Sequence, residues 1–308
     1  MKDYIKIARP EHWVKNAFVL PGTALAMLLI DNTISMGLII KIIIGLLATC
    51  FIASANYVIN EWLDAGTDQY HPTKKTRPVV SGNIKGKFVI IEYIVLIILG
   101  LGLSILINRP FLYTEIWLLV MGVLYNVKPF RTKDIVYLDV ITESINNMIR
   151  LLLGWFMVTS TLLPPSSIII GYWMAGAFLM ATKRFAEYRM IDNPELAGNY
   201  RKSFKYYTEH TLMATSIFYA LGSTFCIGVF LIKYRVEYLV AIPFLFALFI
   251  YYFIMAFEFD SAAQKPEKLF KEKKLMILVV CLIVVLILAT LVDMPFLNAL
   301  TTTEYIAI

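Results

Sequence analysis

The chain has 308 residues, of which 59% are hydrophobic and only 16% are charged, and its mean hydropathy is +0.71. This composition is too apolar for an ordinary soluble domain. Cys50, Cys226 and Cys281 all fall in apolar segments, which argues against a disulfide framework or a zinc site. The composition therefore predicts an all-α, polytopic membrane protein.

Apolar segments long enough to cross a bilayer recur along the whole chain. A transmembrane helix needs about 20 mostly apolar residues, and about 17 still suffice. We expect nine such helices, at 14–30, 37–58, 88–107, 112–127, 135–158, 166–182, 211–232, 238–257 and 275–292; the 112–127 segment is short and carries Glu115. The N-terminal MKDYIKIARPEHW is charged and has no apolar stretch, so it does not resemble a cleavable signal peptide. Residues 1–308 are predicted to form a single integral membrane domain.

Basic residues are concentrated in alternate loops. Of the 28 Lys and Arg residues, 23 fall in the segments 1–15, 60–87, 128–134, 183–210 and 258–274. This asymmetry predicts that the N-terminus and these loops are cytoplasmic, in a bacterial-type inner or plasma membrane, and that the C-terminal TTTEYIAI lies outside. The net charge of +6 favours anionic lipids and substrates as partners and gives no sign of nucleic-acid binding.

Two of the predicted cytoplasmic loops, 60–87 and 183–210, are much longer than a turn requires. They follow the second and the sixth predicted helix, so they recur four helices apart. This spacing predicts two four-helix halves with a ninth helix appended. Long charged loops on one membrane face usually carry function, so we expect the active site at the cytoplasmic face.

The second predicted helix ends in a column of oxygen-bearing side chains. If the helix continues past 58, Asn56, Asn60, Asp64 and Asp68 recur every four residues, and Glu61 precedes Asp64 by three. Carboxylates at this spacing repel one another unless a cation lies between them, and all-oxygen ligands suit Mg²⁺, with Mn²⁺ as a substitute. We therefore predict that Asn60, Glu61, Asp64 and Asp68 bind a metal; the alternative is a solvated loop that only enforces topology.

A basic cluster follows the acids directly. Lys74, Lys75 and Arg77 are bracketed by Pro72 and Pro78, which restrict the backbone of the cluster. Cations next to a Mg²⁺ site are suited to binding the phosphate charge that the metal does not neutralise. The sequence from 60 to 78 therefore predicts a site for a metal-bound diphosphate.

The acid column, NE-x-x-D-x-x-x-D at 60–68, resembles the NDxxDxxxD motif of the UbiA superfamily of intramembrane prenyltransferases, which bind a diphosphate through Mg²⁺. The segments HPTKKTRPVVSG after it, ARPEHWVKN at 8–16 and KRFAE at 183–187 are similar to the branch that makes polyprenyl-phosphate 5-phosphoribose, the decaprenyl-phosphate phosphoribosyltransferases. The resemblance implies a membrane transferase and a phosphate-binding role for Lys15. This chain departs from the motif at Glu61, where Asp is usual, so Glu61 is the ligand that the resemblance supports least.

The second long loop begins with cations. UbiA members that use aromatic acceptors carry a second acidic motif here, whereas this chain has KRFAEYRMID at 183–192. Lys183 and Glu187, and also Arg184 and Tyr188, are four residues apart and would pair along one helical turn. The exchange of acids for cations favours a substrate with an additional phosphate, so these four residues are predicted to bind phosphate; the alternative is a helix-end salt bridge.

The fifth predicted helix has a polar face. Asp139, Glu143, Asn146 and Arg150 are spaced by four, three and four residues, which places them on one side of a helix that enters the membrane. Ionisable groups at such depth are costly and usually line a polar cavity. We expect a polar groove in which Asp139 touches the soluble substrate and Arg150 pairs with Glu143 or Asn146 or meets a lipid phosphate; a purely structural buried pair is the alternative.

Together with the resemblance, these residues imply the transfer of 5-phosphoribose from 5-phosphoribosyl 1-diphosphate to a polyprenyl phosphate, with Mg²⁺ bound and pyrophosphate released. Two other functions stay open at this stage. A UbiA-type prenyltransferase would join an isoprenoid diphosphate to an aromatic or lipid acceptor at the same acidic site. A transporter of phosphorylated lipids or sugars would also use intramembrane charge, but polarity here is concentrated at one face.

Overall fold

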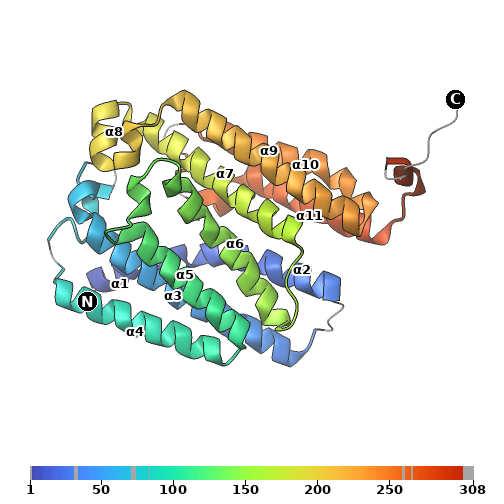
Figure 1. The fold of residues 1–308 in the computed structure, drawn as a ribbon, viewed down its shortest axis with the longest axis horizontal. Coiled ribbons are helices and arrows are strands. Elements are labelled where there is room, and N and C mark those ends of the chain that lie inside the picture. Colours follow the sequence, from blue (N-terminus) through green and yellow to red (C-terminus); the bar gives the residue numbers. More distant parts are fainter. Residues whose placement is uncertain are drawn as a thin grey trace.

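The computed structural model describes residues 2–30, 34–70, 74–82, 84–258, 261–264 and 266–300, and the regular elements in these ranges are all helical (Figure 1). The predicted all-α class is therefore confirmed. His71 and Pro72 of the first long loop, and the C-terminal TTTEYIAI, lie outside the described residues. The N-terminal half comprises α1 (Lys2–Ala8), the 3₁₀ helix η1 (Pro10–Val19), α2 (Leu20–Ile30), α3 (Met36–Asp68), η2 (Lys74–Thr76), α4 (Gly86–Ile105), α5 (Arg109–Asn126) and η3 (Thr132–Asp134).

The remaining elements begin with the central helix α6. They are α6 (Leu138–Val158), α7 (Ser166–Ile191), α8 (Pro194–Tyr200), η4 (Lys202–Lys205), α9 (Glu209–Tyr234), η5 (Val236–Ala241), α10 (Ile242–Met255), η6 (Pro266–Lys271), α11 (Lys273–Leu291) and η7 (Pro295–Leu300). In Figure 1, α6 and α7 lie in the middle of the bundle, with α3, α4 and α5 on one side and α9, α10 and α11 on the other. The nine apolar segments predicted from the sequence all coincide with helices.

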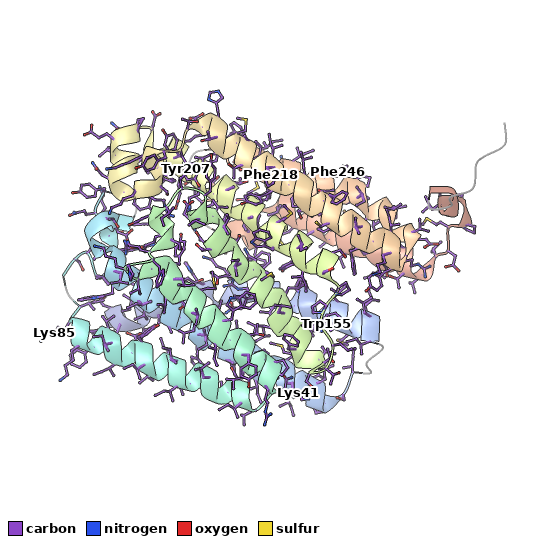
Figure 2. All side chains as sticks on the ribbon, viewed as in Figure 1. Lys41, Lys85, Trp155, Tyr207, Phe218 and Phe246 are labelled. Carbon is purple, nitrogen blue, oxygen red and sulfur yellow. The ribbon has the colours of Figure 1, made fainter. Side chains whose placement is uncertain are left out.

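Six helical stretches within the described ranges are long and apolar enough to cross a membrane: Lys2–Ile30, Met36–Asp68, Gly86–Ile105, Glu209–Tyr234, Val236–Met255 and Lys273–Leu291. Helices α5, α6 and α7 are not in this set, which is defined by length and apolar composition. The charged residues of these helices include Glu115, Asp139 and Arg184, which are buried. Large apolar side chains project outward from the bundle, including Phe218 of α9 and Phe246 of α10, which are 63% and 46% exposed (Figure 2). This surface is suited to lipid, and the chain is an integral membrane protein.

Two helices run further than their predicted apolar segments. Helix α3 continues to Asp68 and α7 continues to Ile191, so the predicted loops 60–87 and 183–210 both begin as helix. Helix α7 ends at Asp192, which adopts the left-handed conformation with a φ of 47°, and Asn193 then caps the short helix α8. These extensions hold the motif side chains of both loops on helical backbone.

The backbones of η1, α2 and α6 approach one another closely. A Cβ atom on Gly22 would lie 2.0 Å from the Leu151 carbonyl oxygen, and one on Gly154 would lie 2.0 Å from that of Val19. Only glycine fits at these two crossings, because any side chain would overlap the partner backbone. The N-terminal segment is thereby held against the middle of α6.

Candidate active site

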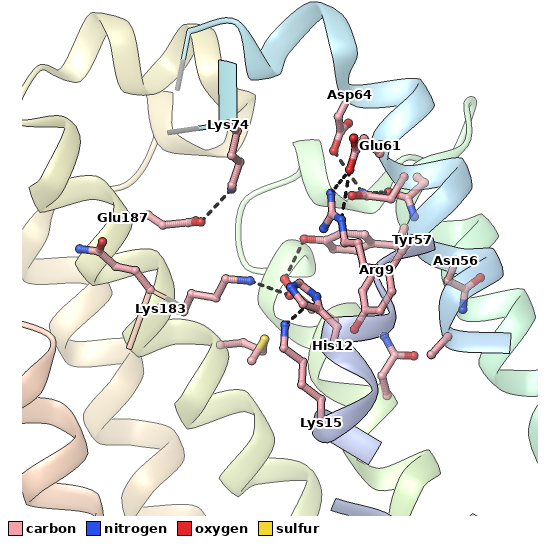
Figure 3. Close-up of a pocket in the computed structure, with 18 of the residues that line it drawn as sticks. Arg9, His12, Lys15, Asn56, Tyr57, Glu61, Asp64, Lys74, Lys183 and Glu187 are labelled. Carbon is pink, nitrogen blue, oxygen red and sulfur yellow. Dashed lines mark hydrogen bonds and ion pairs between the residues drawn. The ribbon is translucent and has the colours of Figure 1, made fainter. Parts of the chain in front are cut away.

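A cavity of about 470 Å³ lies where α3, α6, α7 and η1 converge below the two long loops (Figure 3). Its lining is strongly charged, with nine Lys and Arg residues and six Asp and Glu residues: Lys6, Arg9, Lys15, Lys74, Arg77, Arg150, Lys183, Arg184 and Arg201, against Glu11, Glu61, Asp64, Asp68, Glu143 and Glu187. The lining therefore carries a formal excess of three positive charges. Such a cavity favours a ligand with several negative charges.

The acid column on α3 lines this cavity, as its spacing predicted, with Asn60, Glu61, Asp64 and Asp68 all in the wall. Glu61 is buried and its Oε2 accepts hydrogen bonds from Arg9 Nε at 3.1 Å and Arg9 Nη2 at 2.6 Å. Asp68 is buried as well and pairs with Arg77, nine residues further along the chain. Two of the acids are thus neutralised by arginines from other elements, α1–η1 and the first loop.

Asp64 is paired by the short loop between α5 and α6. Arg131 Nη2 lies 2.9 Å from Asp64 Oδ1, Lys133 Nζ donates to the same oxygen, and Asn60 Nδ2 lies 3.1 Å from Oδ2. Burial lowers the pKa of Lys133 to about 8, and the neighbouring Asp64 carboxylate opposes that effect. In the sequence, this loop indicated only the topology, so Arg131 and Lys133 were not predicted as site residues.

Among the described residues, no group of three His, Cys, Asp or Glu side chains converges as a metal cluster would. The predicted repulsion along the acid column is relieved here by basic side chains, one or two for each acid. The donor types nevertheless suit Mg²⁺, because Asp64 and Asp68 present carboxylate oxygens to the cavity and the buried Glu61 Oε1 has no hydrogen-bond partner. These residues can therefore hold a divalent cation if the pairing lysines and arginines turn to an anionic ligand.

Lys74 joins the two long loops across the cavity mouth. Its Nζ lies 3.1 Å from Glu187 Oε1 and 4.7 Å from the centre of the Tyr200 ring, and it also donates to the Tyr200 hydroxyl (Figure 3). Burial alone would lower the pKa of Lys74, but the Glu187 carboxylate and Tyr200 outweigh it and raise the pKa. The predicted phosphate ligand Lys75 is exposed and does not line the cavity.

Arg184 is the centre of a buried ionic cluster. Its side chain is fully buried and contacts Glu187 Oε2 at 2.8 Å, Glu143 Oε2, and Asp139 Oδ2 at 3.6 Å. Lys183 Nζ lies 3.3 Å from Glu143 Oε1, so both cations reach across to α6 rather than forming the predicted pairs along α7. Tyr188, the fourth predicted phosphate ligand in this loop, packs its ring against Phe204 and does not line the cavity.

Asp139 lies behind the cavity wall. Its side chain is fully buried and accepts hydrogen bonds from Ser203 Oγ at 3.0 Å and Tyr207 Oη at 2.7 Å, while Arg201 Nη1 lies 3.6 Å away. In this position Asp139 anchors the second loop to α6, in place of the predicted contact with a soluble substrate. The same loop brings Arg201 into the cavity, a residue that the sequence reasoning counted only as a loop charge.

The remaining predicted residues line the inner part of the cavity. Lys15 Nζ lies 3.1 Å from His12 Nδ1 on the η1 wall (Figure 3). Arg150 contacts the Asn146 backbone carbonyl and Asn16 Oδ1, each at 3.3 Å, and does not reach Glu143. Arg9, which pairs with Glu61, was missed although it belongs to the ARPEHWVKN segment; its place in that motif was the available signal.

The profile of the UbiA prenyltransferase family matches residues 18–278 of the chain. The chain belongs to the UbiA prenyltransferase family. This membership sets the transporter hypothesis aside. The resemblance inferred from the motifs is confirmed.

Curated relatives of this UbiA-family chain include two decaprenyl-phosphate phosphoribosyltransferases. That of Corynebacterium glutamicum is 29% identical over 219 residues, which are 66% of this chain and 59% of the relative; that of Mycolicibacterium smegmatis is 26% identical over 227 residues, 73% of this chain and 68% of the relative. Among solved structures, the UbiA homologue of Archaeoglobus fulgidus bound to GPP and Mg²⁺ matches with a TM-score of 0.69 at 20% identity, covering 94% of this chain and all of that chain. The fold is UbiA-like.

Proposed function

We propose that this protein transfers 5-phosphoribose from 5-phosphoribosyl 1-diphosphate to a polyprenyl phosphate and releases pyrophosphate. The observation that carries the proposal is the positive excess in the cavity lining, together with the presence of cations from both long loops: Lys74 and Arg77 from the first, and Lys183, Arg184 and Arg201 from the second. The donor substrate bears a diphosphate at one end and a 5-phosphate at the other, so it needs cations at two places. The similarity to two decaprenyl-phosphate phosphoribosyltransferases supports the same choice.

The first loop and the α3 column would bind the diphosphate. Asp64 and Asp68, with Asn60 and Glu61 beside them, would hold Mg²⁺, which neutralises negative charge on the diphosphate and on the leaving pyrophosphate. Arg77 pairs with Asp68, and a metal on Asp68 would release the guanidinium for a phosphate oxygen. The basic side chains that neutralise the acids here thus become phosphate ligands in the loaded site.

The second loop would bind the 5-phosphate. Lys183 is 19% exposed at its side chain and borders the cavity, whereas Arg184 is fully buried among three carboxylates. We therefore assign the direct phosphate contact to Lys183, with Lys74 opposite, and assign to Arg184 the positioning of Glu143 and Glu187. An oxygen of the lipid phosphate then bonds to the anomeric carbon as the bond from that carbon to pyrophosphate breaks. A phosphate monoester is already ionised, so no strong base is required.

The proposal includes an orientation in the membrane. All nine predicted segments would cross the bilayer, with the N-terminus and both long loops in the cytoplasm and the C-terminus outside. The charge distribution supports this arrangement, because 23 of the 28 Lys and Arg residues lie in the segments assigned to the cytoplasm. Both substrates are then reached from one side, the soluble one through the loops and the lipid from the membrane.

A prenyltransferase acting on an isoprenoid diphosphate is the second candidate. It is favoured by the fold similarity to Archaeoglobus fulgidus structures bound to GPP or DMAPP with Mg²⁺. It would use the same α3 column but would leave the cations of the second loop without a phosphate. Since Lys183 of the second loop and Lys74 opposite it both line the cavity, we favour the donor with two phosphorylated ends.

The deciding experiment follows the label. Purified protein is incubated with Mg²⁺, ribose-labelled 5-phosphoribosyl 1-diphosphate and a polyprenyl phosphate, and the label is measured in the lipid phase, with Asp68→Asn as the inactive control. A parallel reaction contains a labelled prenyl diphosphate and an aromatic acid. Label in the lipid phase of the first reaction is expected; product from the second reaction alone would reverse the order of the two candidates.

A further inference from the structure

One arginine of the cavity makes no direct ion pair with any described residue. Among the described residues, no carboxylate lies within ion-pair distance of Arg150, whose recorded contacts are to Asn16 Oδ1 and the Asn146 carbonyl. By contrast, each of the other arginines that line the cavity contacts a carboxylate directly: Arg9, Arg77, Arg184 and Arg201. Arg150 is also on a helix that lies in the middle of the bundle, where an unpaired charge is costly and usually marks a functional site.

The contacts of Arg150 hold the guanidinium in place without neutralising it. Asn16 is buried, and its Nδ2 donates to Cys50 Sγ at 3.1 Å, which turns its Oδ1 towards Arg150 Nε. The Asn146 carbonyl fixes Nη1 from one turn earlier on α6. Both partners are neutral amides, so the guanidinium is positioned by hydrogen bonds and not by an ion pair. A preorganised guanidinium of this kind is suited to a phosphate, which it can bind through two parallel hydrogen bonds.

Among the described residues of α6 that line the cavity, Arg150 is the one farthest from the loops, and we call this part of the cavity its inner end. Immediately beyond it, the backbones of η1 and α2 meet α6 at Gly22 and Gly154, where even a Cβ atom would not fit. Arg150 follows Glu143 by seven residues, so it lies about 10 Å deeper along α6 than the ionic cluster at the loops. An anion at Arg150 is therefore well separated from one held by Lys183.

The surroundings distinguish this inner end from the mouth. Asn146 and Asn147 line the same wall of α6, and the side-chain NH2 groups of these residues are hydrogen-bond donors. The cavity lining also includes apolar side chains that lie away from the loops, such as Phe18 of η1 and Leu179 and Met180 of α7. Amide and guanidinium donors next to apolar surface match a phosphate monoester carried on a hydrocarbon chain better than a fully water-soluble sugar phosphate.

We propose that Arg150, supported by Asn16 and Asn146, binds the phosphate of the lipid acceptor at the inner end of the cavity. This assignment rests on the proposed function and adds the acceptor subsite to it. The lipid phosphate is held deeper than the donor's phosphates, and the loops bind the donor above it. The two anions are thereby bound by different cations, which offsets the repulsion that would otherwise oppose their approach.

The test measures binding, with purified protein and four probes: farnesyl monophosphate, farnesol, 5-phosphoribosyl 1-diphosphate and inorganic pyrophosphate. Arg150→Gln should weaken farnesyl monophosphate binding about 10- to 100-fold and change farnesol binding little, because only the phosphate loses its partner. The affinities for the two soluble ligands should stay within about threefold. The matched control is Lys41→Gln, which removes the same charge from an exposed position on α3 (Figure 2) and should alter none of the four.

Two outcomes would overturn the assignment: unchanged farnesyl monophosphate binding in Arg150→Gln, or an equal loss for 5-phosphoribosyl 1-diphosphate or pyrophosphate. If Arg150→Gln does not fold, Arg150→Lys keeps the charge but loses the paired hydrogen bonds, and the same order of losses, smaller in size, is expected. These measurements need no turnover. A wild type that binds farnesyl monophosphate through Arg150 but transfers no phosphoribose would therefore contradict the proposed function alone.

Discussion

Replacing Asp64 with Asn separates two roles of one carboxylate, because the substitution keeps the shape of the side chain and removes its charge. Asp64 pairs with Arg131 and Lys133, and the exposed fractions of the three side chains are 16%, 14% and 5%. Removing one partner of a fully buried pair costs about 3–5 kcal/mol, whereas an exposed pair contributes less than about 1 kcal/mol. These side chains are mostly buried but border a hydrated cavity, so we expect Asp64→Asn to lower the free energy of unfolding by about 2–3 kcal/mol.

Thermal unfolding in detergent, first in EDTA and then with Mg²⁺ and pyrophosphate, measures both roles. A ligand at 100 times its Kd stabilises the native state by about 2.7 kcal/mol, so the wild type should melt higher with Mg²⁺ and pyrophosphate. Asp64→Asn should melt lower than the wild type in EDTA and should gain little from the ligand. The control is Asp134→Asn, since Asp134 Oδ2 also pairs with Arg131, at 3.1 Å, but does not line the cavity.

Either of two results would refute this reasoning. If Asp64→Asn is as stable as the wild type in EDTA, the ion pairs with Arg131 and Lys133 contribute nothing to stability. If the variant gains as much from Mg²⁺ and pyrophosphate as the wild type does, Asp64 is not a ligand of the metal. Asp134→Asn should show a small loss in EDTA and the full gain with ligand.

Metal removal, one lysine substitution and one labelling experiment test the rest of the proposal. Transfer should stop in EDTA and return with Mg²⁺ or Mn²⁺, and full turnover in EDTA would show that the reaction needs no metal. Asp68→Asn should abolish turnover, and Glu61→Gln should reduce turnover less. Lys183→Ala should weaken the binding of 5-phosphoribosyl 1-diphosphate by about 1.5–3 kcal/mol, roughly 10- to 150-fold, and should weaken the binding of pyrophosphate less. The control is Lys75→Ala, at an exposed position, and equally weakened binding of both ligands in Lys183→Ala would favour the prenyltransferase. The cysteine introduced by Lys202→Cys, at a position where the lysine side chain is 66% exposed, should react with an impermeant maleimide only from the cytoplasmic side. Labelling from the outside alone would show that the proposed topology is reversed.

The local part of this site could be predicted from the sequence. The four-residue spacing of Asn60, Asp64 and Asp68 placed them on one face of α3, and the cavity is lined by that face. On α6, the same kind of spacing placed Glu143, Asn146 and Arg150 in the lining, whereas the fourth predicted residue, Asp139, lies behind it. Helical periodicity relates residues that are close in the chain, and α3 did continue past its apolar segment, to Asp68.

The helices, their apolar lengths and the faces that carry polar side chains follow from the sequence, because these depend on residues within a few turns of one another. Which charges meet depends on how the helices pack. Glu61 is neutralised by Arg9 from 52 residues away, and Asp64 by Arg131 and Lys133 from 67 and 69 residues away. Such pairs form because helix packing brings distant segments together, and no periodic pattern within the chain encodes them. Among the described residues, the same packing brings no carboxylate within ion-pair distance of Arg150.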